Sequence, residues 1–337
     1  MFRKILEFFA RLLRRAPPPP GRFVAGSKFA WRGRLGMAPV LWPRREYLLY
    51  LPRGYSRWRR RTLVVLIHGC KQTPEDIATG TRICERADRH GWLVLFPRQT
   101  DRANPWSCWN WFDSATAAGR GEAAIVMAQL KAVRRGYRVH PRRMYAAGMS
   151  AGGAMAATLG VRFPQSFAGI FVHSGLACGA ASSPSAAIAV MSRGADTDPE
   201  EIGARARADA GGATLVPLVA VHGEDDEVVA PVNAVQIVRQ YLALNGRTGI
   251  PGAKGDRPAP DAESEVTLDE GRTMHVDEYR DGERVVARLV RIPKLGHAWS
   301  GGDGSLPYND PQLPDATGLL ADFVEGVPAT VQSKVSA

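Results

Sequence analysis

The sequence predicts an α/β fold in which a mostly parallel, doubly wound sheet carries helices on both faces. Along most of the 337 residues, apolar runs of strand length alternate with segments of helical periodicity. The run 62–67 (TLVVLI) is apolar after its first residue, as expected for a central parallel strand buried on both faces. Strand–helix alternation of this length implies right-handed crossovers between parallel strands.

Local patterns place the elements in chain order. Residues 46–51 (EYLLYL) are expected to form an early antiparallel strand ahead of the run 62–67. Asp281-Gly282 is typical of a two-residue hairpin turn. The remaining strands are expected at 92–96, 143–147, 168–172, 216–221, 273–279 and 284–292, and the helices at 74–89, 121–136, from 153 onward, 231–244 and 315–325.

Two stretches interrupt the alternation. Residues 176–212 are rich in Ala and Ser and then in charged residues, which indicates a small helical insertion over the functional site. Residues 246–266 are rich in Gly, Pro and acidic residues, which indicates a surface loop. We therefore expect one domain over residues 21–330, interrupted at these two places.

The first 20 residues differ from the rest. Between Met1 and Arg15, apolar residues interleave with basic ones, which is the pattern of a basic amphipathic helix, and the prolines at 17–20 form a stiff spacer. This segment either contacts an anionic membrane or polymer granule surface, or packs on the domain, or frays. Glu7 and Arg11 interrupt the apolar run that a secretory signal needs, which favours a cytoplasmic location.

Charge and cysteines exclude some classes of function. The net charge is +11, but the arginines are spread along the chain without a nucleic-acid motif, so a solvated surface is favoured over a nucleic-acid partner. The four cysteines lack the spacing of a metal site, and no metal is expected. Cys70 and Cys108 both fall in loops expected near the site, and a disulfide between them is left open.

One pentapeptide carries the strongest chemical signal. Gly148-Met149-Ser150-Ala151-Gly152 lies where an apolar strand runs into an alanine-rich helix. This is G-x-S-x-G in strand–turn–helix context, the nucleophile elbow of α/β-hydrolases. The serine must occupy a sharp, strained turn, and small flanking residues let strand and helix approach closely. Ser150 is therefore the predicted nucleophile of a hydrolase.

The partners of such a serine follow in the order acid, then histidine. His222-Gly223-Glu224-Asp225-Asp226-Glu227 places several acidic residues at the end of the strand expected at 216–221. After them only His275 and His297 remain. His275 falls inside the expected hairpin, whereas His297 lies in a glycine-flanked loop just past a strand. His297 is therefore the predicted general base, with one of the acidic residues behind it.

Ester or amide hydrolysis also needs two backbone N–H donors for the tetrahedral oxyanion. One is expected from Ala151, the residue after the nucleophile, at a helix N-terminus. The other is expected from Cys70 in the loop after strand 62–67, where Gly69 lets the chain turn. These two amides form the predicted oxyanion hole.

Together these segments resemble the esterases of the polyhydroxybutyrate (PHB) depolymerase family, which are related to feruloyl and acetylxylan esterases. The resemblance spans about residues 40–325 and rests on LIHGCKQ (66–72), CWNWF (108–112), GMSAGG (148–153), HSGL (173–176), HGEDD (222–226) and GHAWSGG (296–302). In that family the acid is the fifth residue of H-G-x-x-D, which implies Asp226. The resemblance implies hydrolysis of carboxylic esters by a Ser–His–Asp triad without metal or cofactor.

The resemblance also bears on substrates. It implies polymeric or oligomeric 3-hydroxyalkanoates or other short acyl esters. The chain stops soon after the last expected helix, without a separate substrate-binding domain, and no cleavable signal is visible although members are often exported. The lack of such a domain and the lack of a visible signal both favour oligomers or soluble esters, and not crystalline polymer, as substrates.

Aromatic residues near the expected site have two interpretations. We assign three tryptophans to substrate binding, where they would form an apolar wall. They are Trp109 and Trp111, in the loop after strand 92–96, and Trp299, close to His297. Alternatively, most of the loop aromatics pack the loop onto the core.

Other functions also stay open: a feruloyl- or acetylxylan-type carbohydrate esterase, a peptidase or thioesterase on the same scaffold, and a non-catalytic surface-binding protein.

Overall fold

The computed structural model describes residues 20–28, 45–212, 215–268 and 271–326. The segment 1–15 and the spacer prolines at 17–19 lie outside the described residues, so the amphipathic helix stays a prediction. Within the described ranges, no helix combines the length and apolarity needed to cross a membrane.

Ten strands of the described residues form one sheet in the order β1-β2-β4-β3-β5-β6-β7-β10-β9-β8. The strands are β1 (Arg22–Lys28), β2 (Arg45–Leu51), β3 (Arg61–Ile67), β4 (Leu93–Pro97), β5 (Val139–Met149), β6 (Gly169–His173), β7 (Leu218–Gly223), β8 (Ala262–Thr267), β9 (Thr273–Asp281) and β10 (Arg284–Ile292). The central run from β4 to β10 is parallel, whereas β1, β2, β8 and β9 pair antiparallel at the two edges. The predicted mostly parallel sheet is confirmed.

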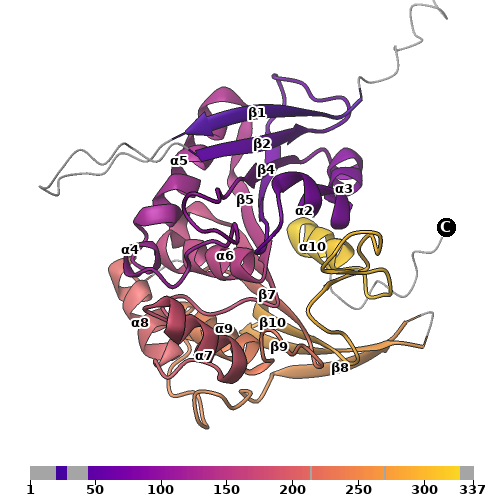
Figure 1. Ribbon diagram of the computed structural model, residues 1–337. Coiled ribbons are helices and arrows are strands. Elements are labelled where there is room, and N and C mark those ends of the chain that lie inside the picture. The colour runs from indigo at the N-terminus through magenta and orange to yellow at the C-terminus, as the bar shows by residue number, and fades with distance from the viewer. Residues whose placement is uncertain (1–19, 29–44, 213–214, 269–270, 327–337) are drawn as a thin grey trace, which may run out of the picture.

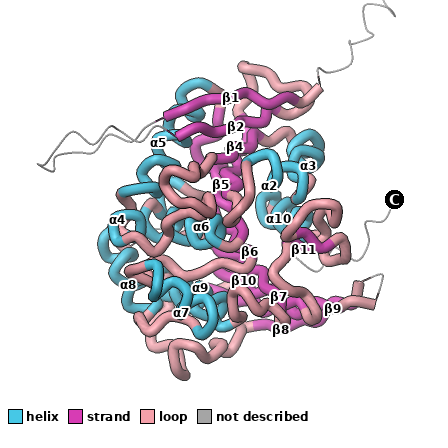
Figure 2. Tube along the Cα trace, in the orientation of Figure 1, coloured by secondary structure: helices cyan, strands magenta, loops and turns pink. Residues whose placement is uncertain are grey.

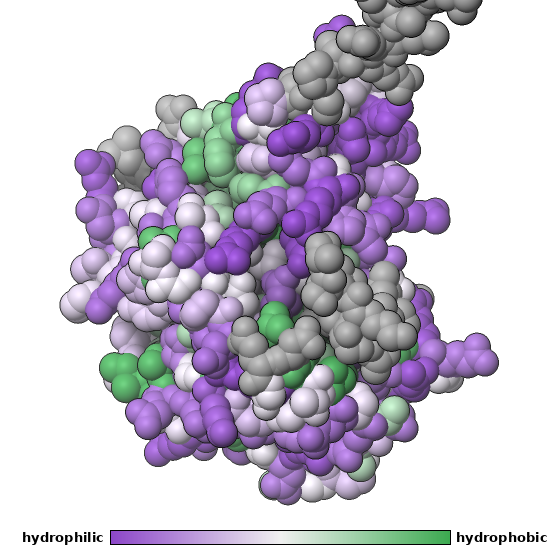
Figure 3. Space-filling model, turned by 90° about the vertical axis from the view of Figure 1, so that its right-hand side faces the viewer, coloured by the Kyte–Doolittle hydropathy of each residue, from purple (hydrophilic) through white to green (hydrophobic). Residues whose placement is uncertain are grey.

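Helices cover both faces of this sheet, as Figures 1 and 2 show. One layer holds α4 to α9, and the other holds α2, α3 and α10. The helices are α2 (Pro74–Gly80), α3 (Ile83–His90), α4 (Ser114–Ala117), α5 (Gly121–Gly136), α6 (Ala151–Arg162), α7 (Pro184–Arg193), α8 (Pro199–Asp209), α9 (Val232–Leu244) and α10 (Ala316–Glu325). Alternate residues of β3 belong to two separate hydrophobic clusters, which confirms a central strand buried on both faces. The side of the molecule shown in Figure 3 is mostly hydrophilic outside the grey atoms, with a few hydrophobic patches.

The helix expected at 74–89 is two helices. Thr73 caps α2 by accepting from the N–H of Asp76, and the chain turns at Arg82, whose φ is 53°. Gly80, at the end of α2, lies against the side chain of Asn309, where a Cβ would be 2.6 Å from Asn309 Nδ2. The left-handed backbone at Arg82 therefore divides a segment whose local pattern is continuous.

The prediction for 246–266 as a loop is wrong at its end. Residues 262–267 form the edge strand β8, which pairs antiparallel with β9. Most side chains of β8 are exposed and polar, so the segment carries little hydrophobic periodicity. The insertion at 176–212 is helical as expected, and its helices α7 and α8 pack against α9. The hairpin of β9 and β10 is also confirmed.

Candidate active site

Ser150 occupies the turn between β5 and α6 with φ 56° and ψ −124°, a conformation that few residues with a Cβ adopt. The glycines of the motif explain how the turn closes. A Cβ at Gly148 would lie 2.3 Å from the carbonyl oxygen of Gly152, and a Cβ at Gly152 would lie 2.1 Å from that of Ile67. The N–H of Ser150 donates to the carbonyl of His173 on β6 at 3.0 Å. These contacts hold the serine in a strained turn at the carboxyl end of β5.

Asp226 and His297, which are far apart in sequence, form a hydrogen bond. His297 Nδ1 lies 2.8 Å from Asp226 Oδ2, and both side chains are largely buried. Asp226 Oδ1 accepts from the N–H groups of Val228 at 3.0 Å and Val229 at 2.8 Å. Burial by itself raises the pKa of this carboxyl, but the hydrogen bonds from His297 and Val229 outweigh it and hold the pKa of Asp226 below its usual value.

The neighbouring acidic residues have other environments. Glu224 forms an ion pair with Arg291 at 3.1 Å, and Asp225 is exposed. Asp226 is the member of the acidic stretch that lies against His297. His275 lies in β9, 3.6 Å from Glu265. Asp226 thus contacts His297, the histidine that the sequence pattern favoured, whereas His275 lies against Glu265.

Two further buried histidines lie beside this pair and were not assigned from the sequence. His222 Nε2 lies 2.7 Å from the carbonyl of Val229 and 3.5 Å from Asp226 Oδ2. Because a carbonyl only accepts, Nε2 carries the proton and Nδ1 is unprotonated. His173 stacks on Trp299 with ring centroids 5.2 Å apart. Burial lowers the pKa of both rings, that of His173 to about 3, so both are neutral.

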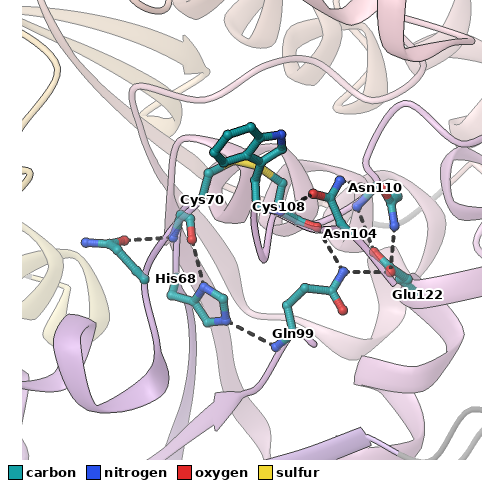
Figure 4. Close-up of a disulfide and its surroundings, with 10 residues drawn as sticks. His68, Cys70, Gln99, Asn104, Cys108, Asn110 and Glu122 are labelled. Atoms are coloured by element: carbon teal, nitrogen blue, oxygen red, sulfur yellow. Dashed lines mark hydrogen bonds between the residues drawn. A yellow bond between two sulfur atoms is a disulfide. The ribbon is translucent and has the colours of Figure 1, made fainter. Parts of the chain in front are cut away.

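The loop after β3 is joined covalently to the loop after β4. Cys70 and Cys108 form a disulfide, which settles the pairing left open above. The N–H of Lys71 donates to the carbonyl of Trp106 at 2.8 Å, and the N–H of Gly69 donates to Gln72 at 2.8 Å. The Cys70 amide therefore sits in a loop that is held from both sides. Figure 4 shows the disulfide and the polar residues around it.

A buried carboxylate organises the loop after β4. Glu122 of α5 accepts from the side chain of Gln99 at 2.6 Å and from the backbone N–H of Asn110 at 2.7 Å (Figure 4). The N–H of Gln99 in turn donates to His68 Nε2 at 3.2 Å. Burial lowers the pKa of His68 to about 4, so this ring accepts as a neutral imidazole. No pattern in the sequence singles out Glu122.

The assignment of Trp109, Trp111 and Trp299 to substrate binding is not supported. Their exposed fractions are 0%, 5% and 1%. Trp109 packs on His68, and the indole N–H of Trp299 donates to Thr317 at 3.0 Å. All three fill the core under the loops, because aromatic content alone does not tell which face of a loop a ring occupies.

Other aromatic residues are exposed near the candidate site. Trp106 is 62% exposed, with the Lys71 ammonium 4.9 Å from its ring centroid. Tyr308 is 37% exposed and meets the ring of His297 edge-on at 6.4 Å. Trp106 is one of the aromatic residues of the loop after strand 92–96 that were considered for substrate binding, whereas no sequence pattern surrounds Tyr308. Among the described residues, no three His, Cys, Asp or Glu side chains gather as a metal site requires.

The family model described as "Esterase PHB depolymerase" matches residues 45–267. The chain belongs to the PHB depolymerase family of esterases. The match includes Cys70, Ser150 and Asp226 and ends before His297.

Curated relatives support this family membership. Poly(3-hydroxyalkanoate) depolymerase C of Paucimonas lemoignei is 31% identical over 188 residues, which are 55% of this chain and 45% of that protein. Feruloyl esterase B of Neurospora crassa is 29% identical over 193 residues, which are 55% of this chain and 65% of that protein. The chain thus matches about half to two-thirds of the length of these PHB depolymerase family relatives.

Solved structures show the same fold. An acetyl xylan esterase from Aspergillus awamori superposes with a TM-score of 0.63 and 19% identity, covering 75% of this chain and 89% of that one. A feruloyl esterase module from Clostridium thermocellum gives a TM-score of 0.54 and 12% identity, covering 96% and 93%. This PHB depolymerase family member therefore has the α/β-hydrolase fold, as predicted.

Proposed function

We propose that the chain is a serine esterase whose single catalytic domain, residues 21–330, uses Ser150, His297 and Asp226. One observation carries the proposal. The His297–Asp226 hydrogen bond of 2.8 Å lies at the carboxyl edge of the sheet on which Ser150 occupies its strained turn. A buried carboxylate behind an imidazole fixes the ring tautomer and stabilises the imidazolium that forms during attack.

Acylation follows from these roles. Ser150 Oγ attacks the ester carbonyl carbon while its proton passes to His297 Nε2, and the carbonyl π electrons move onto oxygen. The oxyanion accepts hydrogen bonds from the N–H groups of Ala151 and Cys70. Ala151 is the first residue of α6, where backbone donors have no partner within the helix. The C–O bond then breaks, and the alcohol leaves with the proton from His297.

Deacylation repeats the sequence with water. His297 takes a proton from a water molecule, which attacks the acyl-enzyme carbonyl. The second tetrahedral intermediate uses the same two amides, and Ser150 leaves with the proton that His297 returns. Asp226 keeps its negative charge throughout, which agrees with the direction in which its pKa is shifted.

The proposed substrates are oligomers of 3-hydroxyalkanoates or other short acyl esters. The similarity to poly(3-hydroxyalkanoate) depolymerase C supports the hydroxyacyl class. The exposed ring of Tyr308 meets the proposed base His297, and the exposed ring of Trp106 lies beside Lys71, next to the proposed oxyanion donor Cys70. A feruloyl- or acetylxylan-type esterase is the second candidate, because feruloyl esterase B matches the chain over a similar length.

One panel of substrates tests the proposal and separates the candidates. It compares kcat/KM for p-nitrophenyl butyrate, 3-hydroxybutyrate oligomers, methyl ferulate and an aminoacyl p-nitroanilide. We expect turnover of the butyrate ester and the oligomers, with little cleavage of the anilide. Preference for methyl ferulate would favour the second candidate. Failure on every ester would contradict the proposed function.

We also propose that residues 1–15 contact an anionic membrane or granule surface. The support is the alternation of apolar residues with Arg3, Lys4, Arg11, Arg14 and Arg15. Replacing these five residues by glutamine in the full chain should weaken partitioning to anionic vesicles or polymer granules. Unchanged partitioning would exclude the contact.

A further inference from the structure

Basic residues are concentrated in two segments that contain no Asp or Glu. Residues 53–61 carry Arg53, Arg57, Arg59, Arg60 and Arg61, and residues 131–143 carry Lys131, Arg134, Arg135, Arg138, Arg142 and Arg143. The sequence pattern alone suggested a scattered solvated surface. The fold brings these two segments together, so the distribution in space is uneven.

Backbone and ring contacts join the two segments into one surface. The N–H of Arg61 donates to the carbonyl of Arg138 at 2.7 Å, and Arg61 pairs with Val139 across β3 and β5. Tyr55 and Tyr137 meet edge-on with centroids 6.1 Å apart. Between them lies a hollow of about 380 Å³ whose charged lining consists of Arg57, Arg60, Arg134, Arg135 and Arg138. We call this surface the arginine face.

Most basic residues of the arginine face lack compensating acidic side chains within the described ranges, although at its margins Arg53 pairs with Asp88 and Arg143 pairs with Glu325. Arg57, Arg59, Arg60 and Arg138 are exposed and form no ion pair there. Arg134 and Arg135 end α5, where positive charge complements the helix dipole. That explanation does not extend to the loop that carries Arg57, Arg59 and Arg60, so this concentration of charge requires another reason.

An exposed tryptophan lies within the same segment. Trp58 is 74% exposed, and the Arg57 guanidinium lies 4.8 Å from its ring centroid. Indole rings favour the boundary between lipid headgroups and acyl chains, and arginines attract anionic headgroups. A protruding indole flanked by unpaired arginines fits a lipid surface.

We propose that the arginine face docks the protein on an anionic phospholipid surface. This face lies at the amino ends of β3 and β5, whereas Ser150 and Cys70 follow the carboxyl ends of the same strands. A docked molecule would therefore hold the Ser150 edge away from the lipid. The proposed esterase site would then receive its substrate from the aqueous side.

The test uses the full chain and two triple variants with the same change in net charge. The first replaces Arg57, Arg60 and Arg138 by glutamate. The matched control replaces Arg120, Arg193 and Arg205 by glutamate, three exposed arginines outside the arginine face. Sedimentation with phosphatidylcholine vesicles, with and without phosphatidylglycerol, measures binding. Circular dichroism checks that each variant is folded.

We expect wild-type protein to bind the anionic vesicles and to release at high salt, because the interaction is screened. The arginine-face variant should bind about 100-fold more weakly, since each basic residue near an anionic surface is worth about 1 kcal/mol. The control should bind as wild type does. If the glutamate variant is unfolded, the corresponding glutamine triple and Trp58→Ala replace it, and both should weaken binding.

Three outcomes would overturn the proposal. Unchanged binding by the folded arginine-face variant, both in the full chain and in a chain whose five basic residues within 1–15 are replaced by glutamine, would exclude the face. Equal weakening in both triple variants would show that only net charge matters. Tighter binding of a single-stranded oligonucleotide than of the vesicles, lost in the arginine-face variant, would assign the face to nucleic acid. None of these results depends on whether the protein hydrolyses esters.

Discussion

At the scale of single residues, Ser150 illustrates strain that the surroundings enforce. A non-glycine residue in an unfavourable backbone region costs about 1–3 kcal/mol. Here Gly148 and Gly152 allow backbone approaches that no Cβ would permit, and a hydrogen bond from Ser150 to β6 fixes the turn. The strained turn places the Ser150 hydroxyl at the edge of the sheet. This position is one reason to regard the serine as the nucleophile.

Asp226 allows a prediction at the same scale. Asp226→Asn should lower kcat by about 10⁴-fold, because an amide cannot stabilise the imidazolium and favours the wrong ring tautomer. The neighbouring Asp225→Asn is the matched control, since Asp225 is exposed, and it should retain activity within about twofold. Steady-state hydrolysis of p-nitrophenyl butyrate measures both. Equal activity of the two variants would remove Asp226 from the mechanism.

At the scale of elements, the loops after the strands are held by contacts between distant segments. The Cys70–Cys108 disulfide and the bonds of Glu122 attach the loop after β4 to the loop after β3 and to α5. These contacts fix the position of the Cys70 amide, which is one of the two proposed oxyanion donors. The element that carries this donor is therefore rigid before substrate arrives.

Reduction of the disulfide should slow catalysis. We expect kcat to fall by about 10- to 100-fold, below the full cost of losing an oxyanion donor, because the loop loosens without disappearing. The bond spans 38 residues, so its loss should also lower the unfolding free energy by about 4 kcal/mol. Activity with and without a thiol reductant measures the first effect, and urea unfolding measures the second.

Two variants isolate that bond from the other cysteines. The Cys108→Ala variant should have a kcat as low as that of the reduced enzyme, and the reductant should not lower this kcat further. Cys84→Ala, which removes a free thiol on α3, should respond to the reductant as wild type does. A fully reduced enzyme with unchanged kcat would show that the disulfide does not position the loop.

The sequence predicted elements and loops with unequal success, for physical reasons. Ser150 and His297 could be proposed from the sequence because each lies just past an apolar strand in a glycine-containing motif. Trp109 and Trp299 were assigned to substrate binding although both are buried, because burial depends on packing that a motif does not encode. Strand β8 was missed because its side chains are exposed and lack an apolar period. Glu122 was missed because its partners come together only in the fold.

At the scale of the whole molecule, buried neutral histidines couple stability to pH. Burial lowers the pKa of His68 to about 4 and that of His173 to about 3, and it also lowers the pKa of His222. In the unfolded chain histidine titrates near 6.5. Below about pH 6.5 the unfolded state therefore binds protons that the folded state does not.

The free energy of unfolding should consequently be highest above about pH 6.5 and fall as the pH drops toward 4. The slope should approach about 1.4 kcal/mol per pH unit for each of the three histidines. Urea unfolding at a series of pH values measures it. His68→Gln should remove about one-third of the part of the slope that the three histidines contribute. A stability that does not change across this range would contradict the neutral, buried state of these rings.

The most direct measurement concerns Ser150 itself. The variant Ser150→Ala should lower kcat for p-nitrophenyl butyrate by about 10⁵–10⁶-fold while leaving substrate binding largely intact. A fluorophosphonate should label the wild-type protein at Ser150, as located by mass spectrometry, and should not label the variant. A variant that keeps a tenth of the wild-type activity, or a label at another serine, would contradict the assignment.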